Sequence, residues 1–173
     1  MKVWKETLPE MIIDQLLLDY DYFYRECLGY FREIEKTYGR FIVLDFHSYC
    51  HRRNGPNCPP DSQENNPDIN IGTGTMRRSD WANVVDRFIG DLSKQTFQGN
   101  PLDVRENIRF RGGWFSHWIH ETFPETGCAL AIEVKKIFMD EWSGKLDKDA
   151  FEETKTALES TIPGLLQELK RVK

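Results

Sequence analysis

His47 is the side chain whose position most strongly suggests metal chemistry. It follows directly on RFIVLDF, residues 40–46, an apolar and β-branched run with the composition of a strand buried on both faces. A neutral imidazole at a strand end can ligate zinc, and Asp45 or a main-chain carbonyl could orient its ring. A structural histidine held by hydrogen bonds is the competing interpretation. The sequence thus predicts a candidate zinc ligand at residue 47.

Glu133 is the candidate for proton transfer. It lies in CALAIEVKK, residues 128–136, which has the run length of a second buried strand. Burial raises the pKa of a carboxyl group, and such a group can accept a proton from a metal-bound water. Pairing with Lys135 or with an arginine is the competing interpretation. Because ligands of α/β proteins gather outside the carboxyl ends of the strands, we expect Glu133 and His47 to converge at one sheet edge.

Three arginines stand beside a glycine pair in RENIRFRGG, residues 105–113. Eight of the twelve arginines lie between Arg52 and Arg111, although the whole chain has a net charge of −5. The guanidinium group forks onto carboxylates, and glycine lets the backbone approach a ligand closely. Pairing of the arginines with some of the 28 acidic residues is an equal alternative. The segment is a candidate site for a small anionic ligand, formed by Arg105, Arg109, Arg111, Gly112 and Gly113.

Two other sets of residues could hold a metal. One set could form a structural zinc loop within residues 47–58, although the gap after its second histidine is longer than in zinc knuckles; its members are His47, Cys50, His51 and Cys58. His117 and His120 have helical i, i+3 spacing, which differs from the spacing of HExxH enzymes. We expect these two to be half-exposed helix residues. The four cysteines form no CxxC pair.

The elements that must position these residues alternate between helix and strand. We expect helices at about residues 8–38, 80–95 and 148–160 and one beginning near Pro163, strands at 40–46, 102–108 and 128–136, and a short helix ending before Pro124. Residues 50–78 carry too many prolines and glycines for a regular element. This order predicts an α/β fold with a mixed, mainly parallel sheet flanked by helices, formed by residues 1–173 as a single domain.

Composition limits the partners. A net charge of −5 argues against a nucleic-acid binder that acts through general positive charge. No apolar stretch is long enough to span a membrane, and the N-terminus lacks an apolar signal region. We therefore predict a cytoplasmic protein without nucleic-acid or membrane partners.

The segments LDFHSYCHRR, RFRGG and ALAIEVKK, in this order, resemble the N-formylglutamate amidohydrolase family over most of the chain. The resemblance implies a zinc-exopeptidase-like α/β fold of the phosphorylase/hydrolase type. In that family, zinc activates a water that hydrolyses N-formyl-L-glutamate, or a related N-acyl amino acid, to formate and glutamate. The resemblance further implies that His47 is the third zinc ligand, that Glu133 is the general base and that Arg111, Gly112 and Gly113 form part of the substrate wall. Asp45 and Ser48 belong to the same motif, beside the ligand.

The first two zinc ligands of the family, a histidine and a glutamate, have no counterpart before His47. We therefore expect the C-terminal part of such a domain, without its N-terminal strands, or a degenerate copy. An unpaired sheet edge would then favour a homo-oligomer or binding of the missing segment. A non-catalytic family member that binds an acidic ligand through the central arginines is the alternative function, and the structural zinc loop is the third.

Overall fold

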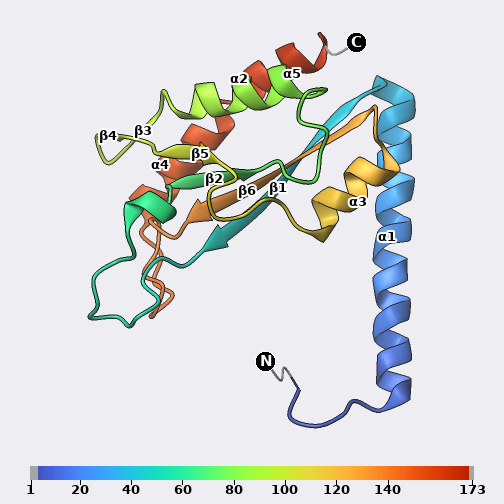
Figure 1. Ribbon diagram of the computed structural model, residues 1–173, viewed down its shortest axis with the longest axis horizontal. Coiled ribbons are helices and arrows are strands. Elements are labelled where there is room, and N and C mark those ends of the chain that lie inside the picture. Colours follow the sequence, from blue (N-terminus) through green and yellow to red (C-terminus); the bar gives the residue numbers. More distant parts are fainter. Residues whose placement is uncertain (1–3, 172–173) are drawn as a thin grey trace. The chain divides into compact units, whose positions relative to one another are not determined.

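The computed structural model describes residues 4–171, and the chain forms two compact units that meet between Arg40 and Phe41 (Figure 1). The first unit is the helix α1, Glu10–Tyr38, as predicted. It ends at Gly39, which has a φ of 79° and donates its N–H to the carbonyl of Glu35. Phe31 is buried, whereas the apolar side chains of Ile12, Leu16 and Phe23 are exposed.

The second unit contains a four-stranded sheet in the order β1-β6-β2-β5. The strands are β1 (Phe41–Tyr49), β2 (Ile69–Gly72), β5 (Val104–Glu106) and β6 (Gly127–Lys135). The β1/β6 and β2/β5 pairs are parallel, and the β2/β6 pair is antiparallel. The expected α/β fold with a mixed, mainly parallel sheet is confirmed.

The strand β2 corrects one prediction, because residues 50–78 were expected to hold no regular element. This segment contains β2 and a short 3-10 helix, η1, Gln63–Asn65. Ile69 and Ile71 face the main core, where both are buried, and Asn70 points to the opposite face. Only four residues long, β2 is stabilised by strands on both sides rather than by its local sequence.

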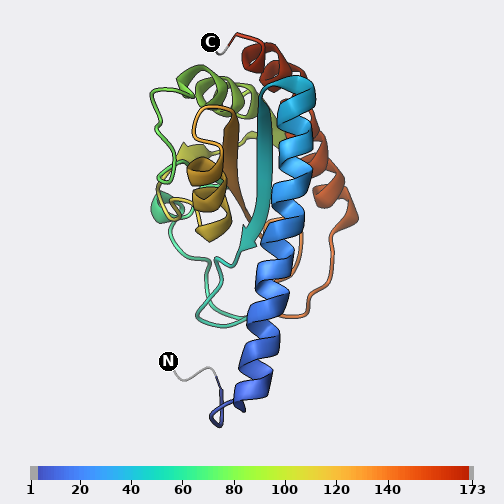
Figure 2. The same cartoon turned by 90° about the vertical axis from the view of Figure 1, so that its right-hand side faces the viewer.

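Three helices build the main core on one face of the sheet, which Figures 1 and 2 show from two directions. They are α2 (Ala82–Leu92), α4 (Lys148–Glu159) and α5 (Ile162–Leu169). The helical spacing in α2 buries Val84, Val85, Phe88 and Leu92. Asp147 caps α4 by accepting the N–H of Ala150 at 3.1 Å.

The opposite face of the sheet carries α3, Trp114–Thr122, which ends before Pro124 as expected. A Cβ added at Gly127, at the start of β6, would lie 2.8 Å from Cβ of Phe123 and 3.2 Å from Cγ2 of Ile119. A small hairpin, β3 (Thr96–Phe97) and β4 (Asn100–Pro101), follows α2. Across residues 4–171, no helix is long and apolar enough to cross a bilayer.

Candidate active site

His47 and Glu133 occupy one register position of the parallel β1/β6 pair. The sequence predicted that His47 directly follows the strand, but β1 continues to Tyr49 and His47 lies within it. Residues in register on neighbouring strands present their side chains on the same face, which here is the α3 face. The His47 side chain is 53% exposed. Burial raises the pKa of Glu133, His47 opposes this shift, and the nearby carboxylate of Asp45 adds to it.

Asp45 connects His47 to α3. One carboxylate oxygen lies 2.9 Å from Nε2 of His47, and the other accepts the hydroxyl of Ser116 at 3.1 Å. Ser116 is fully buried, and the Asp45 side chain is only 13% exposed. The imidazole therefore has a fixed partner on one nitrogen. Ser48 points to the other face of the sheet by strand alternation, so the structure does not bring it to this cluster.

The glycine-rich segment crosses the same face. A Cβ on Gly72 would lie 2.5 Å from the nitrogen of Gly112, and one on Gly112 would lie 3.8 Å from Cβ of Ala131. Gly112 has a φ of 103°, which favours glycine, and Gly74 donates its N–H to the carbonyl of Arg111 at 2.7 Å. Gly113 is then the N-cap residue of α3. The backbone thus passes close to the sheet, two residues along β6 from Glu133.

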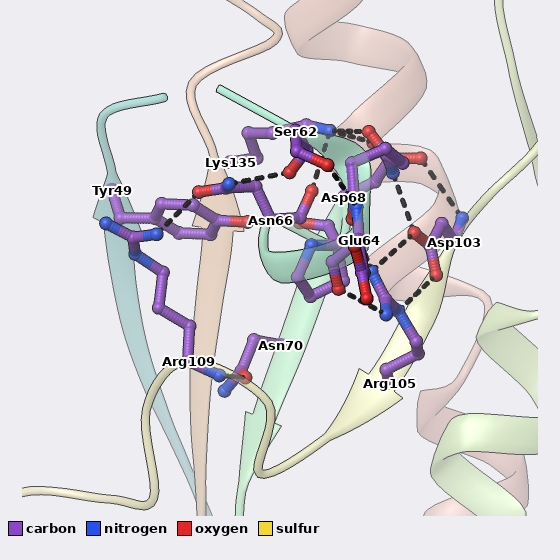
Figure 3. A network of polar contacts seen from close by, with 12 residues as sticks. Tyr49, Ser62, Glu64, Asn66, Asp68, Asn70, Asp103, Arg105, Arg109 and Lys135 are labelled. Atoms are coloured by element: carbon purple, nitrogen blue, oxygen red, sulfur yellow. Dashed lines mark hydrogen bonds and ion pairs between the residues drawn. The ribbon is translucent and has the colours of Figure 1, made fainter. Parts of the chain in front are cut away.

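The three arginines have different environments, and Figure 3 shows those of Arg105 and Arg109. Arg105 pairs with Asp103 at 2.8 Å and donates to the carbonyls of Gln63 and Glu64. Arg109 donates to Oδ1 of Asn66 at 2.6 Å and lies over the Tyr49 ring, 5.4 Å from its centroid. Arg111 is exposed.

Asn70 is a site residue that the sequence analysis missed. It is fully buried and in register with Glu133 on the antiparallel side of β6. Its Oδ1 accepts the N–H of Arg109 at 2.9 Å, and its Nδ2 donates to the carbonyl of Phe110 at 2.8 Å. The available signal was a polar residue between two isoleucines in INIG. Ser116 carried no comparable signal, because its role depends on a contact with β1.

The other predicted metal ligands have separate partners. His117 faces Glu121, and His120 contacts the Thr75 hydroxyl and accepts the N–H of Ala129, each at 3.0 Å. In the proposed zinc loop, His47 contacts Asp45, Cys50 contacts Lys136, His51 contacts Glu141, and Cys58 donates to the carbonyl of Asn54.

A zinc site needs more than these residues provide. Between residues 4 and 171, no three His, Cys, Asp or Glu side chains are gathered in a way that could hold a metal ion. Nε2 of His47 is already engaged by Asp45. The residues described therefore do not fit a complete catalytic zinc centre, which normally takes three protein ligands.

An apolar groove of about 520 Å³ lies beside β1. Leu44, Phe46 and Ser48 line it from β1, and Phe151 and Leu158 line it from α4. Side chains alternate between the two faces along a strand. Apart from His47, the β1 and β6 residues that line the groove therefore lie on the face opposite to Asp45 and Glu133. The groove is therefore separate from the carboxylates of the candidate site.

Comparisons with known proteins give one family. The family model described as N-formylglutamate amidohydrolase matches residues 3–139. Among solved structures, the crystal structure of N-formylglutamate amidohydrolase from Ralstonia eutropha JMP134 is similar, with a TM-score of 0.45 and 15% sequence identity. The similarity covers 82% of this chain and 48% of that one, so the chain spans about half of its length. No curated protein matches the sequence significantly.

Proposed function

We propose that this chain, which belongs to the N-formylglutamate amidohydrolase family, carries part of an amidohydrolase active site. The substrate would be N-formyl-L-glutamate or a related N-acyl amino acid, and water would cleave its amide bond. The products would be formate and glutamate. The observation that supports this proposal is the shared register of His47 and Glu133, with Asp45 holding the His47 ring.

Glu133 is the proposed proton carrier. Its pKa is raised by burial, which brings the carboxylate nearer to the working pH of a general base. In the proposed reaction, Glu133 takes a proton from the attacking water as the oxygen bonds to the acyl carbon. It then gives this proton to the departing amide nitrogen as the C–N bond breaks, so the carboxylate is regenerated.

His47 is the proposed contribution of this chain to zinc binding. The remaining ligands of a complete site are not assembled by the residues that the structure describes. We propose that they come from a second copy or from another polypeptide, and that the assembled form is the active one. Asp45 would keep the His47 ring oriented in that assembly.

The first test measures formate released from N-formyl-L-glutamate by the purified chain, with added zinc and with a chelator. We expect zinc-dependent release, and Glu133→Gln should reduce it by about 100-fold or more. Glu152→Gln is the matched control, because this exposed glutamate on α4 pairs with Lys155 at 3.4 Å. The proposal fails if neither the chain nor its assembly with an added partner releases formate, or if both variants lose the same activity.

A non-catalytic role as a binder of an acidic ligand is the second candidate. The specific observation in its favour is Arg109, which has no acidic partner among residues 4–171. Binding of glutamate without any release of formate from the acylated compound would select this alternative.

A further inference from the structure

We infer that Arg109, and not Arg105 or Arg111, binds the carboxylate of the ligand. This inference depends on the proposed function only for the position of the ligand's amide group beside Glu133. It assigns a specific role within a segment that the sequence could describe only as rich in arginine.

The guanidinium group of Arg109 is already oriented. It donates to Asn66 at 2.6 Å, and the rings of Tyr49 and Phe110 lie 5.4 and 5.7 Å from it. Among the ion pairs within residues 4–171, none involves Arg109, whereas Arg105 has Asp103. An arginine has five N–H donors, so a group fixed by one hydrogen bond and two rings keeps donors for a ligand.

The backbone of Arg109 is fixed as well. Both polar atoms of the buried Asn70 amide bond the main chain of residues 109–110, in the way that a neighbouring strand would. Figure 3 shows Asn70 beside Arg109. Asn66, the partner of the guanidinium group, is itself held, because its carbonyl accepts the ammonium of Lys135 at 3.0 Å. The ligand would therefore not have to order this side chain on binding.

The position suits a small carboxylic acid. Tyr49, under the guanidinium group, is two residues beyond His47 on the same strand face, which corresponds to about 6.6 Å along β1. In an N-acyl dicarboxylic amino acid, three to five covalent bonds separate the acyl carbon from the carboxylate carbons, a span of about 4–6 Å. An amide beside Glu133 thus places a carboxylate within reach of Arg109.

The two rival arginines are poorer candidates. Arg105 uses its donors on Asp103 and on two main-chain carbonyls, so its charge is neutralised within the fold. Arg111 is exposed, and within residues 4–171 no ring or amide holds its guanidinium group. Exposed, unrestrained charges bind carboxylates weakly in water.

Calorimetric titration of L-glutamate and of glutarate into the purified chain tests the inference. We expect the wild type to bind both, and Arg109→Met to bind at least 10-fold more weakly. Arg111→Met tests the rival arginine of the same segment and should bind within 2-fold of the wild type. Arg109→Lys keeps the charge but loses the planar fork, so its affinity should be intermediate. Thermal melting shows whether each variant remains folded. If Arg109→Met does not fold, the affinity of Arg109→Lys decides the test.

Three results would overturn the inference: no binding by the wild type at 20 mM ligand, about the same affinity for Arg109→Met as for the wild type, or equal losses in Arg109→Met and Arg111→Met. Formate release, measured in parallel, separates this inference from the proposed function. Arg109-dependent binding without hydrolysis leaves the inference standing and removes the function. Hydrolysis by Arg109→Met with an unchanged KM would support the proposed function and overturn the inference about Arg109.

Discussion

Glu133 on β6 lies in register with His47 of β1 on one side and with Asn70 of β2 on the other. The three side chains form a row across the sheet on the α3 face. Each end of this row leads to a second element, because Asp45 links the His47 ring to α3 and Asn70 holds the backbone of Arg109. The arrangement brings residues that are far apart in sequence into one polar row across the α3 face of the sheet.

The stability of the protein should increase when Glu133 is replaced by glutamine. Burial raises the folded-state pKa of Glu133, so this carboxyl group opposes folding once the pH exceeds that value. Its favourable contribution is present below the unfolded pKa and is lost as the pH rises through the folded pKa. We expect Glu133→Gln to raise the Tm by a few degrees at pH 7 and to have little effect near pH 4. Calorimetric melts at both pH values measure this, and a lower Tm at pH 7 would contradict it.

The contact between Asp45 and Ser116 should be cooperative. Asp45→Ala removes the partner of His47 and leaves the buried Ser116 hydroxyl without this acceptor, so we expect a loss of about 1–3 kcal/mol. Ser116→Ala should cost about 1 kcal/mol. In the double variant the loss should be smaller than the sum of the two. Urea unfolding of the four proteins measures the coupling, and strict additivity would show that the two side chains act independently.

His120 should make folding sensitive to acid. Burial lowers its pKa to about 4, below the ordinary value near 6.5. The N–H of Ala129 donates to Nε2, which assigns the ring proton to Nδ1 facing Thr75. Between pH 6.5 and about 4 the unfolded chain binds the extra proton, so the free energy of unfolding falls as the pH falls through this window.

The test for His120 is its replacement by glutamine, which can still form hydrogen bonds but does not titrate. We expect His120→Gln to flatten the dependence of the unfolding free energy on pH between 6.5 and 4. Urea titrations at closely spaced pH values provide the measurement. Parallel curves for the variant and the wild type would rule out His120 as the source.

Gly72 should tolerate no side chain. A Cβ there would meet the main chain at 2.5 Å and 2.8 Å, at Gly112 and Arg111, and main-chain atoms cannot rotate away. We expect Gly72→Ala to cost about 1–3 kcal/mol and to displace the segment that carries Arg109. Gly90→Ala is the control, because a Cβ added at this helical glycine would meet nothing within 4 Å. Alanine is also more favourable than glycine in a helix by about 1 kcal/mol. Equal effects of the two changes on urea unfolding would contradict the expected close approach.

Local patterns predicted the long elements well. Each long element carries its pattern within its own sequence. This is true of the apolar runs of β1 and β6, and of the helical spacing of Val84, Val85 and Phe88 in α2. The convergence of His47 and Glu133 also followed, since both strands run in the same direction.

The missed features all depend on tertiary contacts. β2 is too short and too rich in neighbouring Pro67, Gly72 and Gly74 to be recognised without its partner strands. Asn70 became a site residue because β6 and residues 109–110 lie on either side of it. The different environments of Arg105 and Arg109 depend on Asp103 and Asn66, which no spacing rule connects to them.

The position of β6 between two strands has a consequence for motion. Between Ala131 and Val134 it is paired with both β1 and β2, so the amides there should exchange with deuterium only when the sheet opens. In the described sheet, β1 is bonded to β6 alone and is an edge strand. We therefore expect the amides of β6, which carries Glu133, to be better protected from exchange than those of β1, which carries His47.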